Sequence, residues 1–486
     1  MDDLFFLPAT EQRRLLVEKR LSATELLDSH LSQIDLWNRG VNAIVTLTPE
    51  RARAAAEAAD AALHGGAEPG ILHGLPVAHK DLHETAGIRT TWGSPIYADH
   101  VPNRTSLIVE RMWQAGSVPL GKTNTPEFGA GSQTFNPVFG ATRNPYDPSK
   151  TSGGSSGGAA AALATGMVAL ADGSDYGASL RNPASFCNVV GFRPTPGRVP
   201  IWPNPLPWWS GSVQGPMART VDDIALFMAA IAGPDNRIPI SIQDSGSIFS
   251  PPVDRHVAGG RIAWSPDVGG LPVDPRVTTV LEKQRNTFEG LGCRIENDEP
   301  DLDGFEEAFM TWRYWRFATL MGDLLREHRA DLKPEIVWNI ERGLELSAEE
   351  LGRADVLRGA LFERAAVFFN RYDYVVCPVS QVPPFDVTDE WVGEINGEPM
   401  EHYLAWLRSC YAFSVIESPA ISVPAGFTDD GLPVGIQIVG RRGDDLGVLR
   451  MARAFEEASE FGTVRPDDLR KPPSPAAGSG ASAPRP

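Results

Sequence analysis

Helix-forming and strand-forming segments alternate along almost the whole chain, which limits the folds it can adopt. The segment RARAAAEAADAAL (51–63) consists mostly of strong helix formers, whereas GLPVAHKD (74–81) is a short apolar run entered from Gly and Pro, as in a buried strand. A predicted helix over 105–116 and a predicted strand over 117–124 repeat the pattern. This alternation is typical of an α/β fold, in which helices cover a sheet. We therefore expect one large α/β domain rather than separable modules.

The remaining segments extend this pattern to both ends of the chain. Residues 10–65 are expected to be helical, and Ser22 and Glu25 have the spacing of a capping box. A helical pattern with many aromatic residues returns over 305–370. The domain is expected to span 1–470, and the tail 471–486, rich in Pro, Ser, Ala and Gly, to be disordered. Further strands are predicted at 372–379, 418–427 and 432–440.

Charge and cysteine content exclude several classes of protein. The net charge of −18 argues against nucleic acid or an anionic membrane as a partner. The four cysteines contain no CxxC pair, so neither a zinc site nor a disulfide framework is expected, and no metal or other cofactor is predicted. The N-terminus lacks the positive charge of a signal peptide, and no apolar run reaches the roughly 18 residues of a membrane span. These features predict a cytoplasmic protein.

Two short motifs point to chemistries that their surroundings do not favour. Gly116–Thr123 matches the phosphate-binding pattern GxxxxGK[ST], but it runs through a predicted strand instead of opening a helix. Gly153–Gly157 matches the GxSxG nucleophile elbow, but no apolar strand precedes it. Histidines do follow in the chain, so a histidine-dependent elbow stays open as an alternative. His79 and His83 are spaced HxxxH without the glutamate of HExxH, and we expect them to have a polar structural role.

Three segments together are more specific than either motif: PVAHKD (76–81), TSGGSSGGAAA (151–161) and the stretch from Ala171 to Thr195. The second and third lie in a Gly- and Ser-rich region (129–197) that is too apolar to be a linker. Together with GKTNTPEFGAGSQ (121–133), the three segments resemble the amidase signature family. The resemblance extends over most of residues 10–460 and is weakest in the helical block near 300–410, where substrate-binding residues are expected.

The resemblance implies a fold and a catalytic site. The fold would be one large mixed sheet covered by helices on both sides. Lys80 stands at the family's triad lysine, Ser155 at its bridging serine and Ser179 at its nucleophile, with the usual spacing between the two serines. The oxyanion hole would be formed by backbone N–H groups of Tyr176, Gly177, Ala178 and Ser179. Ala178 departs from the family's Gly-Gly and would be strained if the position needs a positive φ. Asp175 and Arg181 are expected to brace this loop.

The chemistry requires a neutral lysine. A serine hydroxyl is a poor nucleophile without an adjacent base. Lowering a lysine pKa from about 10.4 to about 7 needs about 4.6 kcal/mol of differential stabilisation. Burial at a strand end such as that of Lys80 can supply a shift of that size. Asp81 would oppose the shift, but its side chain is expected to point to the other face of the strand.

The substrate is expected to be a small-molecule amide, bulky or aromatic, with esters and carbamates (urethanes) cleaved through the same acyl-enzyme. The aromatic segments 201–209 and 311–317 favour such a substrate where they line the pocket rather than the core. Ala130, Gly131, Ser132, Trp208 and Trp209 are the expected substrate-binding residues. The protein would act as a monomer or homodimer. The alternative is the glutaminase subunit of a tRNA-dependent amidotransferase, which shares the signature but needs a small polar pocket.

Overall fold

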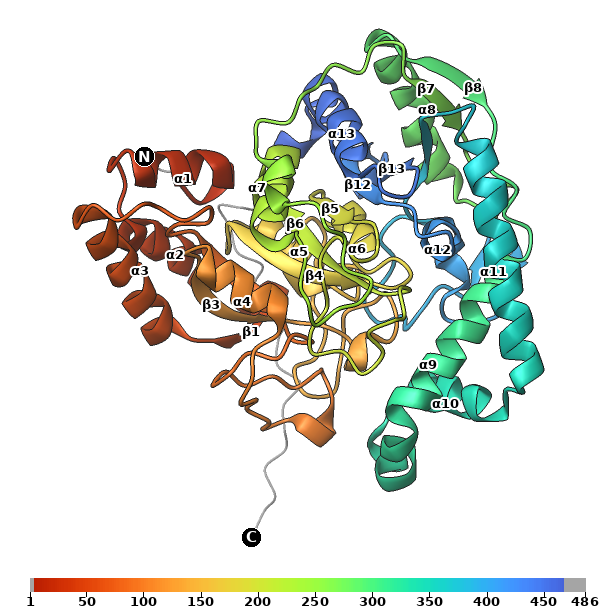
Figure 1. The fold of residues 1–486 in the computed structure, drawn as a ribbon, viewed down its shortest axis with the longest axis horizontal. Helices are drawn as coiled ribbons and strands as arrows, with labels where there is room; N and C mark the ends of the chain where they lie inside the picture. Colours follow the sequence, from red (N-terminus) through yellow and green to blue (C-terminus); the bar gives the residue numbers. More distant parts are fainter. Residues whose placement is uncertain (1–3, 467–486) are drawn as a thin grey trace.

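A computed structural model of the protein describes residues 4–466 and contains an 11-stranded mixed sheet (Figure 1). The strand order is β1-β3-β2-β4-β6-β5-β12-β13-β9-β7-β8. The sheet is parallel among β3, β2 and β4 and again among β9, β7 and β8, and antiparallel between these groups. This architecture confirms the predicted fold class. The predicted tail, 471–486, lies outside the described residues, as do residues 467–470 that end the predicted domain.

The elements have the following bounds. The strands of the sheet are β1 (Ile44–Leu47), β2 (Pro76–Lys80), β3 (Val118–Thr123), β4 (Leu170–Asp175), β5 (Val190–Arg193), β6 (Val213–Ala218), β7 (Arg261–Trp264), β8 (Arg294–Asn297), β9 (Tyr374–Pro378), β12 (Ala420–Phe427) and β13 (Pro433–Gly440). A separate hairpin comprises β10 (Glu394–Ile395) and β11 (Glu398–Pro399). The helices are α1 (Ala9–Val17), α2 (Ala23–Val41), α3 (Pro49–His64), α4 (Leu107–Gln114), α5 (Gly157–Ala164), α6 (Arg181–Phe186), α7 (Val221–Ile231), α8 (Pro275–Gly290), α9 (Phe305–His328), α10 (Pro334–Glu345), α11 (Ala348–Phe368), α12 (Arg408–Val415) and α13 (Asp445–Ser459).

The N-terminal region is helical with one exception. The capping box that begins α2 is present, because Ser22 accepts a hydrogen bond from the Glu25 N–H and the Glu25 carboxylate accepts one from the Ser22 N–H. The prediction of helix over 10–65 was wrong at β1, which pairs antiparallel with β3 at the end of the sheet. Four residues between two helices are too few to show a strand periodicity.

Helices cover both faces of the sheet. In β13 the position of Gly435 lies against Ser185 of α6, whereas that of Gly440 lies against Val448 of α13. Residues an odd number apart in a strand face opposite sides, so α6 and α13 lie on opposite faces. Helix α5 contacts α6, and α7 and α8 contact α13. Every residue of α5 is a buried Gly, Ala or Leu, and these small side chains let the helix approach the strands closely.

The long helices α9, α10 and α11 form the region that the sequence predicted to vary with substrate. They lie at the end of the molecule opposite α1–α3 (Figure 1). An apolar cluster connects α9 and α10 to the segment around residue 130, and its members are Ala130, Phe317, Leu325, Leu332, Ile336 and Ile340. In residues 4–466 no helix is both long and apolar enough to cross a bilayer.

Candidate active site

Lys80 ends strand β2 and is completely buried. Its Nζ lies 2.8 Å from the Oγ of Ser155, 2.8 Å from the Oγ of Ser156 and 3.2 Å from the Oγ of Ser174. Burial lowers the pKa of Lys80 to about 7. Asp81, one residue further, turns away and accepts a hydrogen bond from the Thr91 hydroxyl at 2.5 Å. The site therefore holds a lysine that is half neutral near pH 7, surrounded by hydroxyl groups.

A buried carboxylate lies beside this lysine. Asp172 of β4 accepts hydrogen bonds from the backbone N–H of Lys80 at 2.8 Å, from Nδ1 of His79 at 2.6 Å and from Nδ1 of His83 at 2.7 Å. Trp113 Nε1 donates to Nε2 of His79 at 3.1 Å, so the proton of that ring is on Nδ1. Burial alone would raise the pKa of Asp172, but the two histidines hold it well below its usual value. The histidines thus have the polar structural role expected from the sequence.

Ser155 lies in a tightly packed turn. The Gly154–Ser155 peptide bond is cis, and the Ser132 hydroxyl donates to the carbonyl oxygen of Gly154. A Cβ on Gly154 would come within 2.9 Å of Thr134 Oγ1, so only glycine fits. Close packing fixes the position of Ser155 relative to Lys80.

Ser179 lies on a second loop that meets the first. The backbone N–H of Ser156 donates to the carbonyl oxygen of Ser179 at 3.3 Å, and the Ser179 side chain is half-buried. Among the described residues, none of the backbone N–H groups of 176–179 donates to another protein group. Ala178 is buried and its φ is not positive, so the strain considered from the sequence does not arise. Residues 177–179 are therefore small, and the backbone N–H groups of 176–179 are available to bind a ligand.

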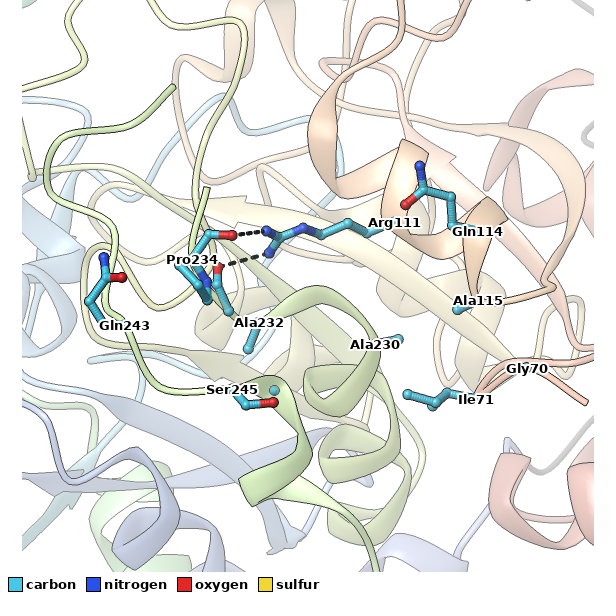
Figure 2. Close-up of a pocket in the computed structure, with 12 residues that line it drawn as sticks. Gly70, Ile71, Arg111, Gln114, Ala115, Ala230, Ala232, Pro234, Gln243 and Ser245 are labelled. Carbon is cyan, nitrogen blue, oxygen red and sulfur yellow. Dashed lines mark hydrogen bonds between the residues drawn. The ribbon is translucent and has the colours of Figure 1, made fainter. Parts of the chain in front are cut away.

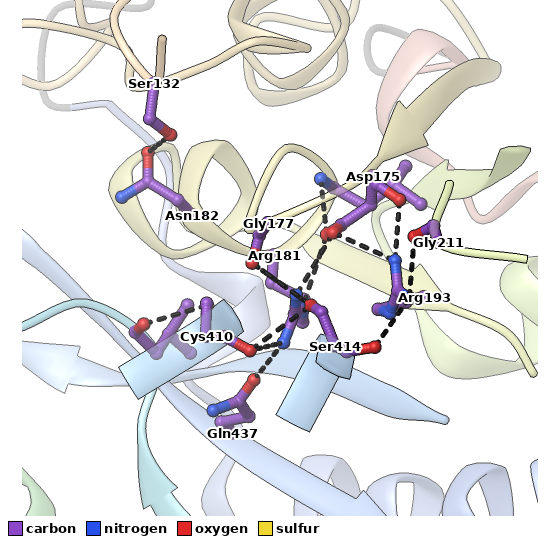
Figure 3. Close-up of polar contacts among 12 residues, drawn as sticks. Ser132, Asp175, Gly177, Arg181, Asn182, Arg193, Gly211, Cys410, Ser414 and Gln437 are labelled. Atoms are coloured by element: carbon purple, nitrogen blue, oxygen red, sulfur yellow. Dashed lines mark hydrogen bonds and ion pairs between the residues drawn. The ribbon is translucent and has the colours of Figure 1, made fainter. Parts of the chain in front are cut away.

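A buried ionic network supports this loop (Figure 3). The guanidinium of Arg181 contacts Asp175 at 3.1 Å and donates to the carbonyl oxygen of Gly177 at 2.7 Å. Arg193 lies 3.3 Å from the same carboxylate and donates to the backbone oxygen of Asp175 at 2.6 Å. Burial alone would raise the pKa of Asp175, but the two arginines lower it. Asp175 and Arg181 therefore brace the loop, as the sequence predicted.

The two motifs that the sequence analysis disfavoured have other roles. Gly116–Thr123 contains the whole of β3 and no α-helix begins at its end, so it is not a phosphate-binding loop. Lys122 is buried and donates to the His83 carbonyl oxygen and, at 2.8 Å, to Thr85 Oγ1. Ser155 has Lys80 as its side-chain partner rather than a histidine, which argues against the GxSxG elbow.

A cavity of about 790 Å³ opens beside these loops. Its walls include Leu82 and Phe128 near the serines, and the side chains of Phe317 and Arg316 from α9. A Cβ on Gly129 would lie 2.9 Å from Leu82 Cδ1 and 3.4 Å from the Oγ of Ser155, so the part of the cavity wall formed by Leu82 lies close to Ser155. This is a suitable place for a substrate.

The residues predicted to bind substrate differ in their surroundings. The ring of Trp209 packs at a tilt against Tyr176, with 5.3 Å between ring centroids, and lines a small pocket with it, whereas Trp208 is 77% exposed. Ala130 and Ser132 are buried, and Gly131 lies near Lys333. Ser132 acts on the turn before Ser155 through its hydrogen bond.

Sequence reasoning missed several polar residues around the site. Ser156 and Ser174 both contact Lys80, and Asp172 anchors its backbone. Arg313 and Arg316 lie in segment 311–317, from which the sequence analysis used only the aromatic residues, as evidence for a bulky or aromatic substrate. The serines lie inside the matching segments, so the Ser155–Ser156 repeat was the available signal. The surroundings of the two arginines depend on tertiary structure, so no sequence pattern could have predicted them.

Comparisons with known proteins show which family the chain belongs to. The sequence profile described as Amidase matches residues 25–449. The chain is 35% identical to an acylamidase from Rhodococcus erythropolis, over 96% of this chain and 98% of that protein. It is 33% identical to a glutamyl-tRNA(Gln) amidotransferase subunit from a Synechococcus strain, over 94% of this chain and 97% of that protein. The crystal structure of a bacterial aryl acylamidase superposes with a TM-score of 0.88 at 30% identity, covering 94% of this chain and 97% of that one. The chain therefore belongs to the amidase signature family of amide hydrolases.

Proposed function

We propose that the protein hydrolyses linear carboxylic amides through an acyl-enzyme on Ser179, with Lys80 as the base and Ser155 as the bridge between them. The observation that carries this proposal is the burial of Lys80, which lowers its pKa to about 7 while its Nζ contacts Ser155. A general base is most effective when its pKa is near the working pH.

The hydroxyl groups around Lys80 fit a neutral amine. A neutral lysine has two N–H donors and one lone pair, whereas three hydroxyls lie within 3.2 Å. Two hydroxyls can accept from it, so the third donates its proton to the lone pair. With Ser155 as that donor, the Ser155 oxygen is free to take the proton of Ser179 as the latter attacks the carbonyl carbon. The proton returns by the same path to the leaving amine.

The loop before Ser179 supplies the means to stabilise the tetrahedral intermediate. Its N–H groups have no partner among the described residues and are available to the oxyanion. Losing one such donor typically costs about 3–4 kcal/mol in the barrier. Tyr176 stacks on Phe309 of α9 at 4.6 Å, and its hydroxyl donates to the Phe309 carbonyl oxygen at 3.2 Å, so α9 holds the loop from outside.

We further propose bulky or aromatic amides as substrates, with esters and carbamates cleaved through the same acyl-enzyme. The cavity is large, and the aromatic side chains that line it are those of Trp92, Tyr97, Phe128, Trp202 and Phe317. Such walls favour an aryl group, since aromatic rings bury a large apolar area. The names of the acylamidase relatives support an amide substrate of this kind.

The test is labelling with a fluorophosphonate, which reacts with activated serines, followed by peptide mapping. We expect the adduct on Ser179 in the native protein and a loss of labelling by about 100-fold or more in Lys80→Ala, as expected when a general base is removed. An adduct on Ser155 that persists in Lys80→Ala would overturn the proposal. Anilides, aryl carbamates and free glutamine are then assayed in parallel. Turnover of glutamine alone would favour the amidotransferase alternative.

A further inference from the structure

An arginine that has no counter-ion among residues 4–466 lines the cavity beside the two serine loops. Arg316 of α9 is mostly buried, and its guanidinium carbon lies 5.1 Å from the centroid of the Trp209 ring. It forms no hydrogen bond or ion pair with any residue in the described part of the chain. Burial lowers its pKa to about 10, so the group is still cationic at neutral pH. A mostly buried cation of this kind is costly unless an anion reaches it.

A second arginine increases the positive charge. Arg313, one turn earlier on α9 and 5% exposed, donates to Asn339 Oδ1 at 3.1 Å and to the Tyr403 hydroxyl at 2.5 Å. Both partners are neutral. The ring of Tyr176 lies 5.7 Å from the guanidinium carbon of Arg313 and also packs against the ring of Trp209, so both arginines lie close to the loop before Ser179.

The other charges of the cavity wall are compensated. Arg104 lies 2.6 Å from the carboxylate of Glu84, and Arg237 lies 2.9 Å from that of Asp235. The wall around Arg316 therefore has an excess of positive charge that the protein itself does not balance.

A second hollow shows how an arginine is otherwise accommodated (Figure 2). It has a volume of about 650 Å³ and lies between α4 and α7, where Arg111 donates to the carbonyl oxygens of Ile231, Gly233 and Pro234. All of these acceptors belong to the protein, so Arg111 has no need of a ligand. In the described part of the chain Arg316 has no such acceptors, although it lines the cavity whose wall at Leu82 lies close to Ser155.

We propose that Arg316 binds a carboxylate of the substrate, so that the enzyme prefers amides that carry a carboxylate at the end remote from the scissile bond. This inference rests on the proposed amidase function and specifies its substrate class. Phe317 and Trp209 provide apolar surface for the spacer, and the guanidinium offers a fork of donors that fits a carboxylate.

The experiment compares pairs of anilides that differ by one carboxylate. Acetanilide is paired with 4-acetamidobenzoate, which places the carboxylate on the amine side. N-phenylpentanamide is paired with N-phenylglutaramate, which places it on the acyl side. We expect kcat/KM to be about 10-fold or more higher for the charged member of one pair. In Arg316→Met this preference falls by about 10- to 100-fold, as for loss of a charge-assisted hydrogen bond, while the neutral member changes less than about threefold. Arg316→Lys should retain part of the preference.

Arg326→Met is the matched control, because Arg326 lies on the same helix but is exposed and pairs with Asp323. It should leave both members of each pair unchanged. No preference for either charged member, or an equal loss of both members in Arg316→Met, would overturn the inference while leaving the amidase proposal intact.

If no anilide is cleaved by the native protein, the amidase proposal fails separately. Carboxylate binding by Arg316 is then tested directly, by measuring the binding of benzoate and benzamide with ligand-observed NMR. Benzoate binding that disappears in Arg316→Met, with benzamide unaffected, would support it. Equal benzoate signals for the native protein and Arg316→Met would overturn it.

Discussion

The buried lysine should make the stability of the fold depend on pH in a defined way. Above about pH 7 the folded protein holds Lys80 neutral, whereas the unfolded chain keeps this lysine protonated up to about pH 10.5. Unfolding therefore takes up a proton in this range and becomes less favourable as the pH rises. The free energy of unfolding therefore gains its full increment from Lys80 above pH 10.5, and this increment is lost as the pH falls to 7. Lys80→Met has no proton to exchange and removes this dependence.

The expected size follows from the same values. Each pH unit in this window changes the free energy of unfolding by about 1.4 kcal/mol per proton. Between pH 7.5 and 9.5, the difference in the free energy of unfolding between the native protein and Lys80→Met should grow by about 3 kcal/mol in favour of the native protein. Urea unfolding followed by tryptophan fluorescence at several pH values measures this difference. A difference that stays constant would refute a lysine whose pKa is lowered by burial.

Lys122→Met is the matched control for the chemistry. Lys122 is buried on the adjacent strand β3, and burial lowers its pKa to about 8. The variant should show a similar dependence of stability on pH, starting near pH 8, yet keep the fluorophosphonate labelling of Ser179. Loss of labelling in Lys122→Met as large as in Lys80→Met would mean that labelling reports on buried charge in general.

Three further variants test neighbouring parts of the site. Asp172→Asn removes a charge that raises the pKa of Lys80, so the acidic limb of the kcat/KM profile should move to lower pH; a shift to higher pH would contradict this. Arg181→Met leaves Asp175 with half of its ionic support and should lower the free energy of unfolding by about 3–5 kcal/mol, measured in urea, as breaking a buried ion pair does. Trp209→Ala should raise KM for anilides by roughly 10-fold through lost aromatic packing. An unchanged KM would mean that Trp209 does not contact the substrate.

The sequence predicted the parts of the fold and site that local pattern controls. Strands β2 and β3 were predicted because apolar runs follow turn residues, and Lys80 could be placed at a strand end for the same reason. The two serine loops were assigned through the resemblance of their segments to the amidase signature family, because their Gly and Ser content alone does not identify a catalytic site.

Features that depend on distant partners were not predictable. Strand β1 has four residues between two helices, and only its pairing with β3 makes it a strand. The partnership of Asp172 with His79 and His83 joins different segments of the chain. Whether Arg316 has a counter-ion depends on every element around the cavity, so an arginine in an aromatic helix gives no local signal.

The arrangement of carboxylates explains how Lys80 can be close to neutral beside two acids. Asp175 and Asp172 both raise the pKa of Lys80, and either could hold it as an ammonium ion. Each carboxylate instead has other partners, because Asp175 is bound by two arginines and Asp172 by two histidines and a backbone N–H. Only uncharged hydroxyls contact the amine itself, so desolvation outweighs the attraction of the acids. The ionic network that braces the loop of Ser179 therefore also allows Lys80 to be unprotonated, and so available as a base, near neutral pH.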